Sequence, residues 1–391
     1  MNRLLKVFLS FVLILTLGGC SIAKDEVQNI DSYQDIIKEK VKNMSIEEKI
    51  DQMMMLAIDN VVDNGKTIRF TNVNEETKNF LNKHQLAGII LFEYNMVNKD
   101  QTQKLTKDIQ ALSKDNKFFI AVDQEGGKVS KIPTSNKTKS AREIGNTKDS
   151  KNAFIAGSTI GQDFEALGLN LDFAPVMDVD TNPNNPIIGD RAFSSDEKVV
   201  AEFGVEFIKG LQSKGILATA KHFPGHGDTS GDSHKELVKV LHPLDRIENV
   251  ELYPFKKAIE NNVDMIMVGH IVVPALDDDR NPATLSKLMI TDLLKEKMGF
   301  KGVVITDAFN MGAISKNYEI KDAVEKSINA GADIILMPVS VVPGGNEKDY
   351  EELVSYIKDK VIKREISEDR LNDAVKRILI SKEKIHAREK M

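Results

Sequence analysis

The sequence has one cysteine in 391 residues, Cys20, so the chain can form no internal disulfide. It also has no block of basic residues, and its formal net charge is −6, which argues against nucleic acid as a partner. We find no repeat of fixed period and no long stretch with the composition of a disordered segment. What remains is an ordinary globular composition, 41% hydrophobic and 29% charged, whose length suits one large domain or two small ones.

The N-terminus carries a short apolar run, VFLSFVLILTL at 7–17, preceded by Arg3 and Lys6. This run is too short to span a bilayer comfortably, and its layout is typical of an export signal. The letters LGGC that end at Cys20 resemble a bacterial lipobox. That resemblance implies cleavage before Cys20, with lipid attached to its sulfur and to the new amino terminus.

We therefore predict a signal peptide at 1–19, a lipidated tether at 20–35 and a folded domain at 36–391. Each buried methylene of an acyl chain contributes about 0.8 kcal/mol, so several chains would hold the protein on a membrane surface. The expected location is the outer face of the cell membrane, as for an exported bacterial lipoprotein with Cys20 as its lipidation site. A plain secretory signal with an incidental cysteine is the alternative interpretation.

The rest of the chain alternates short apolar runs with helical patterns. Continuous apolar runs of this length are typical of strands buried on both faces, as in a parallel sheet. Eight of them, each followed by a helix or a long loop, predict an α/β fold, a (β/α)8 barrel of the TIM type forming a single catalytic domain. An open doubly wound sheet is the structural alternative. The predicted strands are MMMLAI (53–58), AGIILF (87–92), FFIAV (118–122), LNLDFAPV (169–176), ILATA (216–220), VDMIMV (263–268), GVVIT (302–306) and ADIILM (332–337).

Helix signals fill the gaps between these runs. Ser45 with Glu48, and Ser194 with Glu197, have the spacing of a capping box, in which a side chain at each end of the first turn binds a backbone amide. Helical spacing of apolar residues also occurs at 248–261 and 287–298, the second ending at a glycine.

Ionisable residues stand just past six of the eight predicted strands. In a barrel of this type the active site forms at the carboxyl ends of the strands, so we expect these side chains to meet there. His270 is interpreted as a core histidine with satisfied hydrogen bonds, and a rim position is its alternative. The strand-end residues are Glu93, Asp123, Asp178, Lys221 with His222, His270 and Asp307.

The loop KHFPGHGDTSGDSH, 221–234, begins at the end of the fifth predicted strand and holds three histidines. His222 and His226 have the i,i+4 spacing of helical zinc sites, but the proline and glycines between and beside them exclude that helix, and we predict no metal. Asp232 and His234 can instead form a pair in which the carboxylate orients the imidazole.

These stretches resemble glycoside hydrolase family 3, in its β-N-acetylglucosaminidase branch. The resemblance spans about residues 36 to 340, and its motifs follow the family's order. Besides the loop 221–234, it is carried by AVDQEGGKVSKI (121–132), DFAPVMDVDTNPNNPIIGDRAFS (172–194), PATLS (282–286) and GVVITDAFNMGAI (302–314), with weaker matches at MSIEEKIDQMM (44–54) and GIILFEYN (88–95).

The resemblance implies that Asp307 is a nucleophile and His234 a general acid/base with Asp232 as its partner. It further implies that the terminal sugar is held by Asp123, Arg191, Lys221 and His222, and in some family members by the position of Lys131. No metal or organic cofactor is implied.

Two positions depart from the family's usual pattern. Lys131 stands where relatives commonly carry arginine, and lysine cannot reproduce the bidentate geometry of a guanidinium. Ala308 replaces a commoner acidic or aromatic residue after Asp307. The segment 182–188 is interpreted as a rigid loop that presents Arg191, with direct contact to the sugar as the alternative.

The function implied is a retaining exo-β-N-acetylglucosaminidase that removes terminal GlcNAc, acting on peptidoglycan fragments with GlcNAc-MurNAc or on chitin fragments. A phosphorylase with the same covalent intermediate is one alternative, because a histidine acid/base repels an anionic attacker less than a carboxylate does. A sugar-binding lipoprotein without turnover is an alternative of another class.

Overall fold

The computed structural model describes residues 35–389 except 115, with side chains described up to 385. The chain divides into two compact units, Met1–Met44 and Ser45–Met391. In the first unit, residues 35–43 are helical. The predicted signal peptide and Cys20 lie outside the described residues, as does the predicted tether up to residue 34. Among the helices of the described part, none combines the length and the apolar character needed to cross a membrane.

The second unit is built on a sheet of eight parallel strands, in the order β11-β9-β7-β6-β5-β4-β1-β12. A bridge between Ile305 and Ile334 brings its two ends together, which makes the sheet a nearly closed barrel. The predicted (β/α)8 barrel is therefore confirmed, and the open doubly wound sheet is wrong. Seven of the predicted runs contain a strand each, and the run 216–220 overlaps β7, which continues three residues further and so includes Lys221 and His222. The strands are β1 (Met54–Ala57), β4 (Gly88–Ile90), β5 (Phe119–Val122), β6 (Leu171–Asp172), β7 (Leu217–Phe223), β9 (Met265–Val268), β11 (Val303–Thr306) and β12 (Ile335–Leu336).

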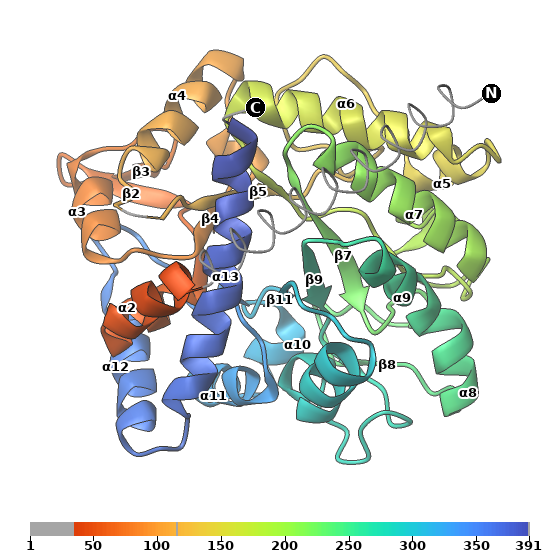
Figure 1. The fold of residues 1–391 in the computed structure, drawn as a ribbon. Helices are drawn as coiled ribbons and strands as arrows, with labels where there is room; N and C mark the ends of the chain where they lie inside the picture. The colour runs from red at the N-terminus through yellow and green to blue at the C-terminus, as the bar shows by residue number, and fades with distance from the viewer. Residues whose placement is uncertain (1–34, 115, 390–391) are drawn as a thin grey trace, which may run out of the picture. The chain divides into compact units, whose positions relative to one another are not determined.

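Helices surround this barrel, and α6 and α7 lie side by side on one flank (Figure 1). Two-stranded additions, β2–β3 and β8–β10, extend from the loops. The helices are α2 (Ile46–Gln52), α3 (Glu75–Lys83), α4 (Lys99–Gln110), α5 (Ala141–Gly145), α6 (Lys151–Leu167), α7 (Glu197–Gln212), α8 (Leu244–Arg246), α9 (Leu252–Glu260), α10 (Gly312–Ser315), α11 (Ile320–Ala330), α12 (Lys348–Ile362) and α13 (Glu368–Glu389), with short 3-10 turns η1 (Glu93–Asn95), η2 (Gly189–Arg191) and η4 (Ala283–Leu285). The added strands are β2 (Asn60–Asp63), β3 (Lys66–Arg69), β8 (Val238–Lys239) and β10 (Ile271–Val272).

The capping signals had different outcomes. Ser45 and Glu48 form the predicted capping box at the start of α2, each side chain accepting from the other's backbone N–H. The prediction for Ser194 is wrong: α7 begins after Asp196, whose carboxylate accepts from two backbone amides of the first turn. Ser194 Oγ instead accepts from the Asp196 N–H at 3.1 Å. A carboxylate cap also complements the positive end of the helix dipole, which favours Asp196 over serine.

The two helices expected from apolar spacing are present, but both contain π-helical hydrogen bonding. The first begins as a π-helix, η3 (Ile247–Glu251), and continues as α9. The second is the π-helix η5 (Leu288–Lys297), followed by Gly299 with φ +74°. A π-turn widens the helix locally and often marks a functional position.

Helix α13 lies across the amino-terminal ends of the strands. Its polar side chains bind groups that precede strands, among them Gln52 before β1 and Asp264 before β9. Asp333, fully buried before β12, accepts from Arg370 of α13 at 2.6 Å, from Lys295 at 2.8 Å and from the Val304 N–H at 2.9 Å. This end of the barrel is thus closed, and the opposite end, where the strands finish, is left for a site.

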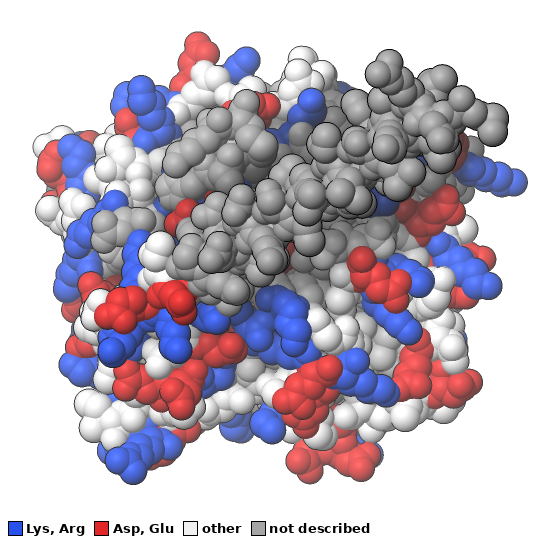
Figure 2. All heavy atoms as spheres, viewed as in Figure 1, with Lys and Arg blue, Asp and Glu red and all other residues white. Residues whose placement is uncertain are grey.

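Charge on the visible face is mixed. In Figure 2 the basic and acidic side chains of the described residues intermingle over the helices, without a broad area of one sign. This agrees with a sequence that lacks a basic block and offers nucleic acid no electrostatic footprint on that face.

Candidate active site

A cavity of about 670 Å³ opens at the carboxyl ends of the strands, a size that suits a small ligand. It is lined by segments that follow β4, β5, β7, β11 and β12, with the loop before α7. All of the predicted catalytic and sugar-binding residues contribute to its wall: Asp123, Lys131, Arg191, Lys221, His222, Asp232, His234 and Asp307.

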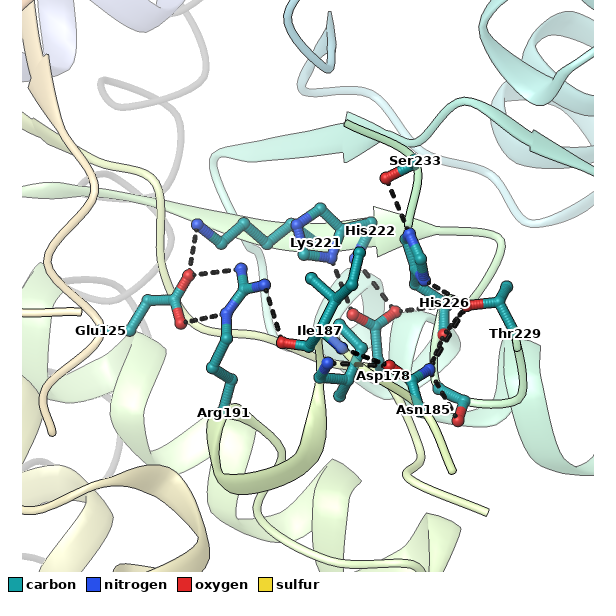
Figure 3. A network of polar contacts seen from close by, with 12 residues as sticks. Glu125, Asp178, Asn185, Ile187, Arg191, Lys221, His222, His226, Thr229 and Ser233 are labelled. Atoms are coloured by element: carbon teal, nitrogen blue, oxygen red, sulfur yellow. Dashed lines mark hydrogen bonds and ion pairs between the residues drawn. The ribbon is translucent and has the colours of Figure 1, made fainter. Parts of the chain in front are cut away.

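The floor of the cavity is a network of two cations and two carboxylates. Lys221 at the end of β7 donates to Asp123 at 2.6 Å and lies 2.7 Å from Glu125. Arg191 donates two parallel hydrogen bonds, each 2.8 Å long, to the carboxylate of Glu125 (Figure 3). Lys221 and Glu125 are buried, so these bonds hold their geometry with little competition from water.

Charge pairing dominates the protonation of this floor. Burial alone would raise the pKa of Glu125, but the charges of Lys221 and Arg191 outweigh it and lower that pKa. Burial would lower the pKa of Lys221, and Asp123 and Glu125 reverse the direction. Arg191 is likewise held protonated, because Glu125 offsets its burial and raises its pKa. Glu125, Lys221 and Arg191 therefore stay ionised around neutral pH and form a fixed network in the cavity floor.

Glu125 is the member of this network that the sequence prediction missed. It lies two residues after Asp123 in the motif AVDQEGG, and its position as a second acid after a strand end was the available signal. Its partners come from β7 and from the loop before α7, so the contact depends on the three-dimensional fold.

His222 is oriented by Asp178, which lies in the segment after β6. Its Nδ1 lies 2.7 Å from Asp178 Oδ2, and the other carboxylate oxygen accepts from the backbone amides of His222 and His226 (Figure 3). Asp178 thus positions the imidazole and also fixes the base of the loop that follows β7.

His226 stabilises this loop through hydrogen bonds to two other residues of the loop. Its Nδ1 lies 2.7 Å from Thr229 Oγ1 and its Nε2 lies 2.9 Å from Ser233 Oγ, so hydroxyls occupy both ring nitrogens. Burial lowers its pKa, which favours the neutral ring.

The far arm of the loop carries Asp232 and His234. The carboxylate accepts from the His234 backbone amide at 2.9 Å and lies 3.1 Å from its Nδ1, which leaves Nε2 free of this contact. The imidazole side chain is 63% exposed. Burial would raise the pKa of Asp232, but its hydrogen bonds to His234 outweigh it and lower that pKa.

Helix α10 holds this arm in place. The backbone amide of Gly312 donates to the carbonyl of His234 at 2.9 Å, and that of Ala313 donates to the carbonyl of Ser233 at 3.2 Å. A Cβ built at Gly312 would lie 2.7 Å from the Lys235 carbonyl oxygen, closer than side chains tolerate. Glycine is therefore required for the loop to approach α10.

Asp307 follows β11 and faces the same cavity. Its Oδ1 accepts from the backbone amide of Ala308 at 2.8 Å. Burial would raise its pKa, but the neighbouring imidazoles of His270 and His222 and this amide lower it. His270 itself is a buried histidine with both nitrogens bonded, to Thr284 and to the Ala308 carbonyl, which confirms its interpretation as a satisfied core residue.

The rim is formed by more exposed groups. Lys131 Nζ lies 4.0 Å from Glu93 Oε2, a weak and partly exposed ion pair. In the segment 182–188, Asn185 Oδ1 accepts from the amides of Ile187 and Ile188, both at 2.9 Å, and these bonds stabilise the turn before Arg191. Ile187 also lines the cavity, so the alternative of direct contact to a ligand stays open.

The arrangement places two kinds of reactive group in one cavity. A carboxylate with a lowered pKa is available as a nucleophile, and an imidazole oriented by a carboxylate is available to transfer protons. Between them, the floor network offers several donors and acceptors to a polar, hydroxyl-rich ligand.

Comparison with known proteins gives consistent results. The model of the glycosyl hydrolase family 3 N-terminal domain matches residues 45–380. Beta-hexosaminidase A of Pseudoalteromonas piscicida is 35% identical over 335 residues, covering 81% of this chain and 56% of that protein. Beta-hexosaminidase of Nitrosomonas eutropha is 33% identical over 275 residues, covering 68% of this chain and 78% of that protein.

A solved structure, a glycoside hydrolase family 3 beta-N-acetylglucosaminidase from Paenibacillus sp. str. FPU-7, is similar in fold and sequence. Its TM-score is 0.81 at 33% identity, over 88% of this chain and 63% of that one. The chain thus spans a little more than half of the first relative and less than two thirds of this structure.

Proposed function

The chain belongs to glycosyl hydrolase family 3, and from this premise we propose that it is a retaining exo-β-N-acetylglucosaminidase that removes terminal β-linked GlcNAc. The observation that carries the proposal is the presence of Asp307 and of the Asp232–His234 pair in the wall of one cavity. The beta-hexosaminidase names of the relatives support the same sugar.

In the first step, a carboxylate oxygen of Asp307 attacks the anomeric carbon as the glycosidic bond breaks. His234 gives its proton to the departing oxygen, so the leaving group departs as a neutral alcohol and the sugar is left esterified to Asp307. Asp232, beside Nδ1, stabilises the imidazolium before transfer and keeps Nε2 toward the substrate.

In the second step, His234 takes a proton from water, and the resulting hydroxide attacks the anomeric carbon from the opposite face. The bond to Asp307 breaks, which regenerates the free carboxylate and the imidazolium. Two inversions give net retention of configuration.

The floor network is proposed to hold the sugar hydroxyls. Asp123 accepts, Arg191 and Lys221 donate, and His222, fixed by Asp178, adds a ring nitrogen. Because these groups are already hydrogen-bonded to one another or to Asp178, little reorganisation is needed when the sugar binds. Lys131 lies at the rim of the cavity beside Glu93, where the family resemblance gives its position a sugar contact in some members.

The substrates proposed are peptidoglycan fragments with a terminal GlcNAc on MurNAc, with chitin fragments as the alternative. The proposal rests on the sequence, whose export signal and lipobox at Cys20 would place the enzyme at the outer face of the cell membrane.

The function is tested by turnover of aryl β-GlcNAc and aryl β-glucoside by wild type and Asp307→Ala. We expect hydrolysis of the GlcNAc substrate, at least tenfold faster than of the glucoside, and loss of nearly all activity in the variant. A protein that binds GlcNAc but turns over neither substrate between pH 5 and 8 would instead be a sugar-binding lipoprotein.

Phosphate in the assay decides between hydrolysis and phosphorolysis. GlcNAc as the dominant product in phosphate buffer supports the hydrolase. GlcNAc 1-phosphate as the dominant product would make the enzyme a phosphorylase that uses the same covalent intermediate.

A further inference from the structure

A second cluster of ligand-type side chains lies at the base of the loop that follows β7, outside the cavity wall. Asp228 belongs to that loop, His242 follows β8, and Glu251 ends the π-helix η3. One nitrogen or oxygen from each residue lies within 4.8 Å of the others. None of the three residues lines the catalytic cavity.

Each of the two carboxylates is held by an outer partner. Asp228 Oδ2 accepts from Thr181 Oγ1 at 2.5 Å, while Oδ1 lies 2.8 Å from His242 Nε2. Glu251 Oε1 accepts from the guanidinium of Arg246. Partners of this kind orient metal-binding carboxylates in known sites, because they fix one oxygen and leave the other free to bind.

The Oε2 atom of Glu251 gives the strongest indication that a ligand binds at this cluster. The side chain is only 4% exposed, and Oε2 is buried with no hydrogen-bond partner in the part of the chain that the structure describes. Burial raises the pKa of Glu251, and Arg246 does not fully offset it. A buried carboxylate oxygen without a hydrogen-bond donor is unfavourable, so a positive ligand that bound this oxygen would stabilise the fold.

We propose that Asp228, His242 and Glu251 bind a divalent cation of the zinc type. One imidazole and two carboxylates form a three-residue set that suits Zn²⁺ with water as the fourth ligand, whereas an imidazole is a poor ligand for Mg²⁺ or Ca²⁺. Two carboxylates against the single guanidinium of Arg246 leave the site negative. His242 and Asp228 are 34% and 23% exposed, which gives an ion access from solvent.

Binding requires small rearrangements. In a tetrahedral zinc site the ligand atoms are about 3.3 Å apart, so the cluster contracts by roughly an ångström or more at its widest separation. His242 Nε2 gives up its contact with Asp228 Oδ1 and presents a lone pair to the ion. In a neutral ring the proton then resides on Nδ1, and an imidazolium releases one proton to solvent.

The position of the cluster suggests a structural role. Asp228 lies two residues after His226 and four before Asp232, within the loop that carries the proposed acid/base. A Cβ built at Gly225 would lie 3.0 Å from Glu251 Cβ, so the loop backbone already packs against the helix that holds Glu251. A cation would join the loop to η3, while α10 holds the far arm that carries His234.

The test is a zinc titration of the full chain after removal of metals with EDTA. We expect about one zinc per wild-type chain, counted by elemental analysis after equilibrium dialysis, with magnesium in excess. His242→Gln and Glu251→Gln each weaken zinc binding at least tenfold. Zinc also raises the melting temperature of wild type and leaves that of these two variants unchanged.

Two control variants sharpen the assignment. Glu248→Gln changes an exposed carboxylate on the same π-helix and retains wild-type zinc binding. His234→Ala also retains it, because the proposed site is separate from the Asp232–His234 pair. Absence of zinc in wild type, unchanged binding in Glu251→Gln, or loss of zinc in His234→Ala would each overturn the proposal. Circular dichroism identifies any variant that does not fold, and the wild-type stoichiometry then still decides.

Discussion

At the scale of single residues, Glu125 holds two cations together in the floor of the cavity. Glu125→Gln leaves Arg191 and Lys221 without their shared carboxylate, and we expect the free energy of unfolding at pH 7 to fall by about 3–5 kcal/mol. Urea unfolding measures this change. Glu202→Gln, which alters an exposed carboxylate on α7, is the control and is expected to change stability by less than about 0.5 kcal/mol.

The pH dependence of this effect has a definite sign. The pKa of Glu125 is lowered in the folded protein, so its contribution is complete above the usual glutamate pKa and is lost as the pH falls through the lower folded value. The stability difference between wild type and Glu125→Gln should therefore be constant from pH 5 to 7 and shrink in stronger acid. A difference that grew on acidification would contradict this assignment.

The sequence was informative about which residues line the cavity and less so about their partners. Asp123, Lys221 and Asp307 follow apolar runs, and the ends of parallel strands share one edge, so their meeting could be predicted. The pairing of Glu125 with Arg191 could not, because it joins two loops separated by 66 positions. Ion pairs of this kind depend on where each loop lies in three dimensions relative to the strand ends, and apolar patterns do not encode these positions.

At the scale of elements, backbone hydrogen bonds from α10 to the loop after β7 fix the position of His234 in the cavity wall. Gly312→Ala would place a Cβ 2.8 Å from the His234 carbonyl oxygen and force the loop outward. Because a displacement of about 1 Å costs on the order of a hundredfold in rate, we expect kcat on an alkyl β-GlcNAc to fall 10- to 100-fold. Ser315→Ala, on the same helix, is the control.

The choice of leaving group separates this effect from a general loss of structure. A dinitrophenyl leaving group departs without protonation, so Gly312→Ala should form the glycosyl-enzyme from this substrate at nearly the wild-type rate. An equal loss on both substrates would mean that the substitution disturbs the nucleophile or the fold rather than the acid/base.

Element boundaries were the weaker part of the prediction. Apolar runs located all eight strands, but the capping signal at Ser194 was two residues early, since an aspartate lay within the same turn and bound the free amides better. The π-turns of η3 and η5 were also not foreseen, because their apolar spacing still fits a helical face over ten residues.

At the scale of the whole unit, Asp333 connects the last two strands to α13 and so closes the amino-terminal end of the barrel. Asp333→Asn leaves Lys295 and Arg370 with a neutral partner, and we expect a loss of about 3–5 kcal/mol in unfolding free energy with kcat and KM unchanged. Asp373→Asn, which removes a half-exposed partner of Arg370, should cost less than about 1 kcal/mol. A changed KM in Asp333→Asn would indicate that this end communicates with the cavity.

The architecture itself was the most predictable feature. Eight apolar runs, each followed by a helix or a loop, can be buried on both faces in only a few arrangements. A closed barrel is the arrangement that leaves no strand edge open. The register of the closing contact between β11 and β12 was not visible in the sequence, because it is set by backbone hydrogen bonds of Ile334 with Val304 and Thr306, which apolar spacing does not encode.

The charge balance of the cavity floor has a consequence for ionic strength. Two carboxylates are already neutralised by two cations of the same protein, so this surface gathers few mobile counterions. A neutral sugar that binds there displaces water but no counterions. The dissociation constant of such a sugar should therefore change less than about twofold between 50 mM and 1 M sodium chloride.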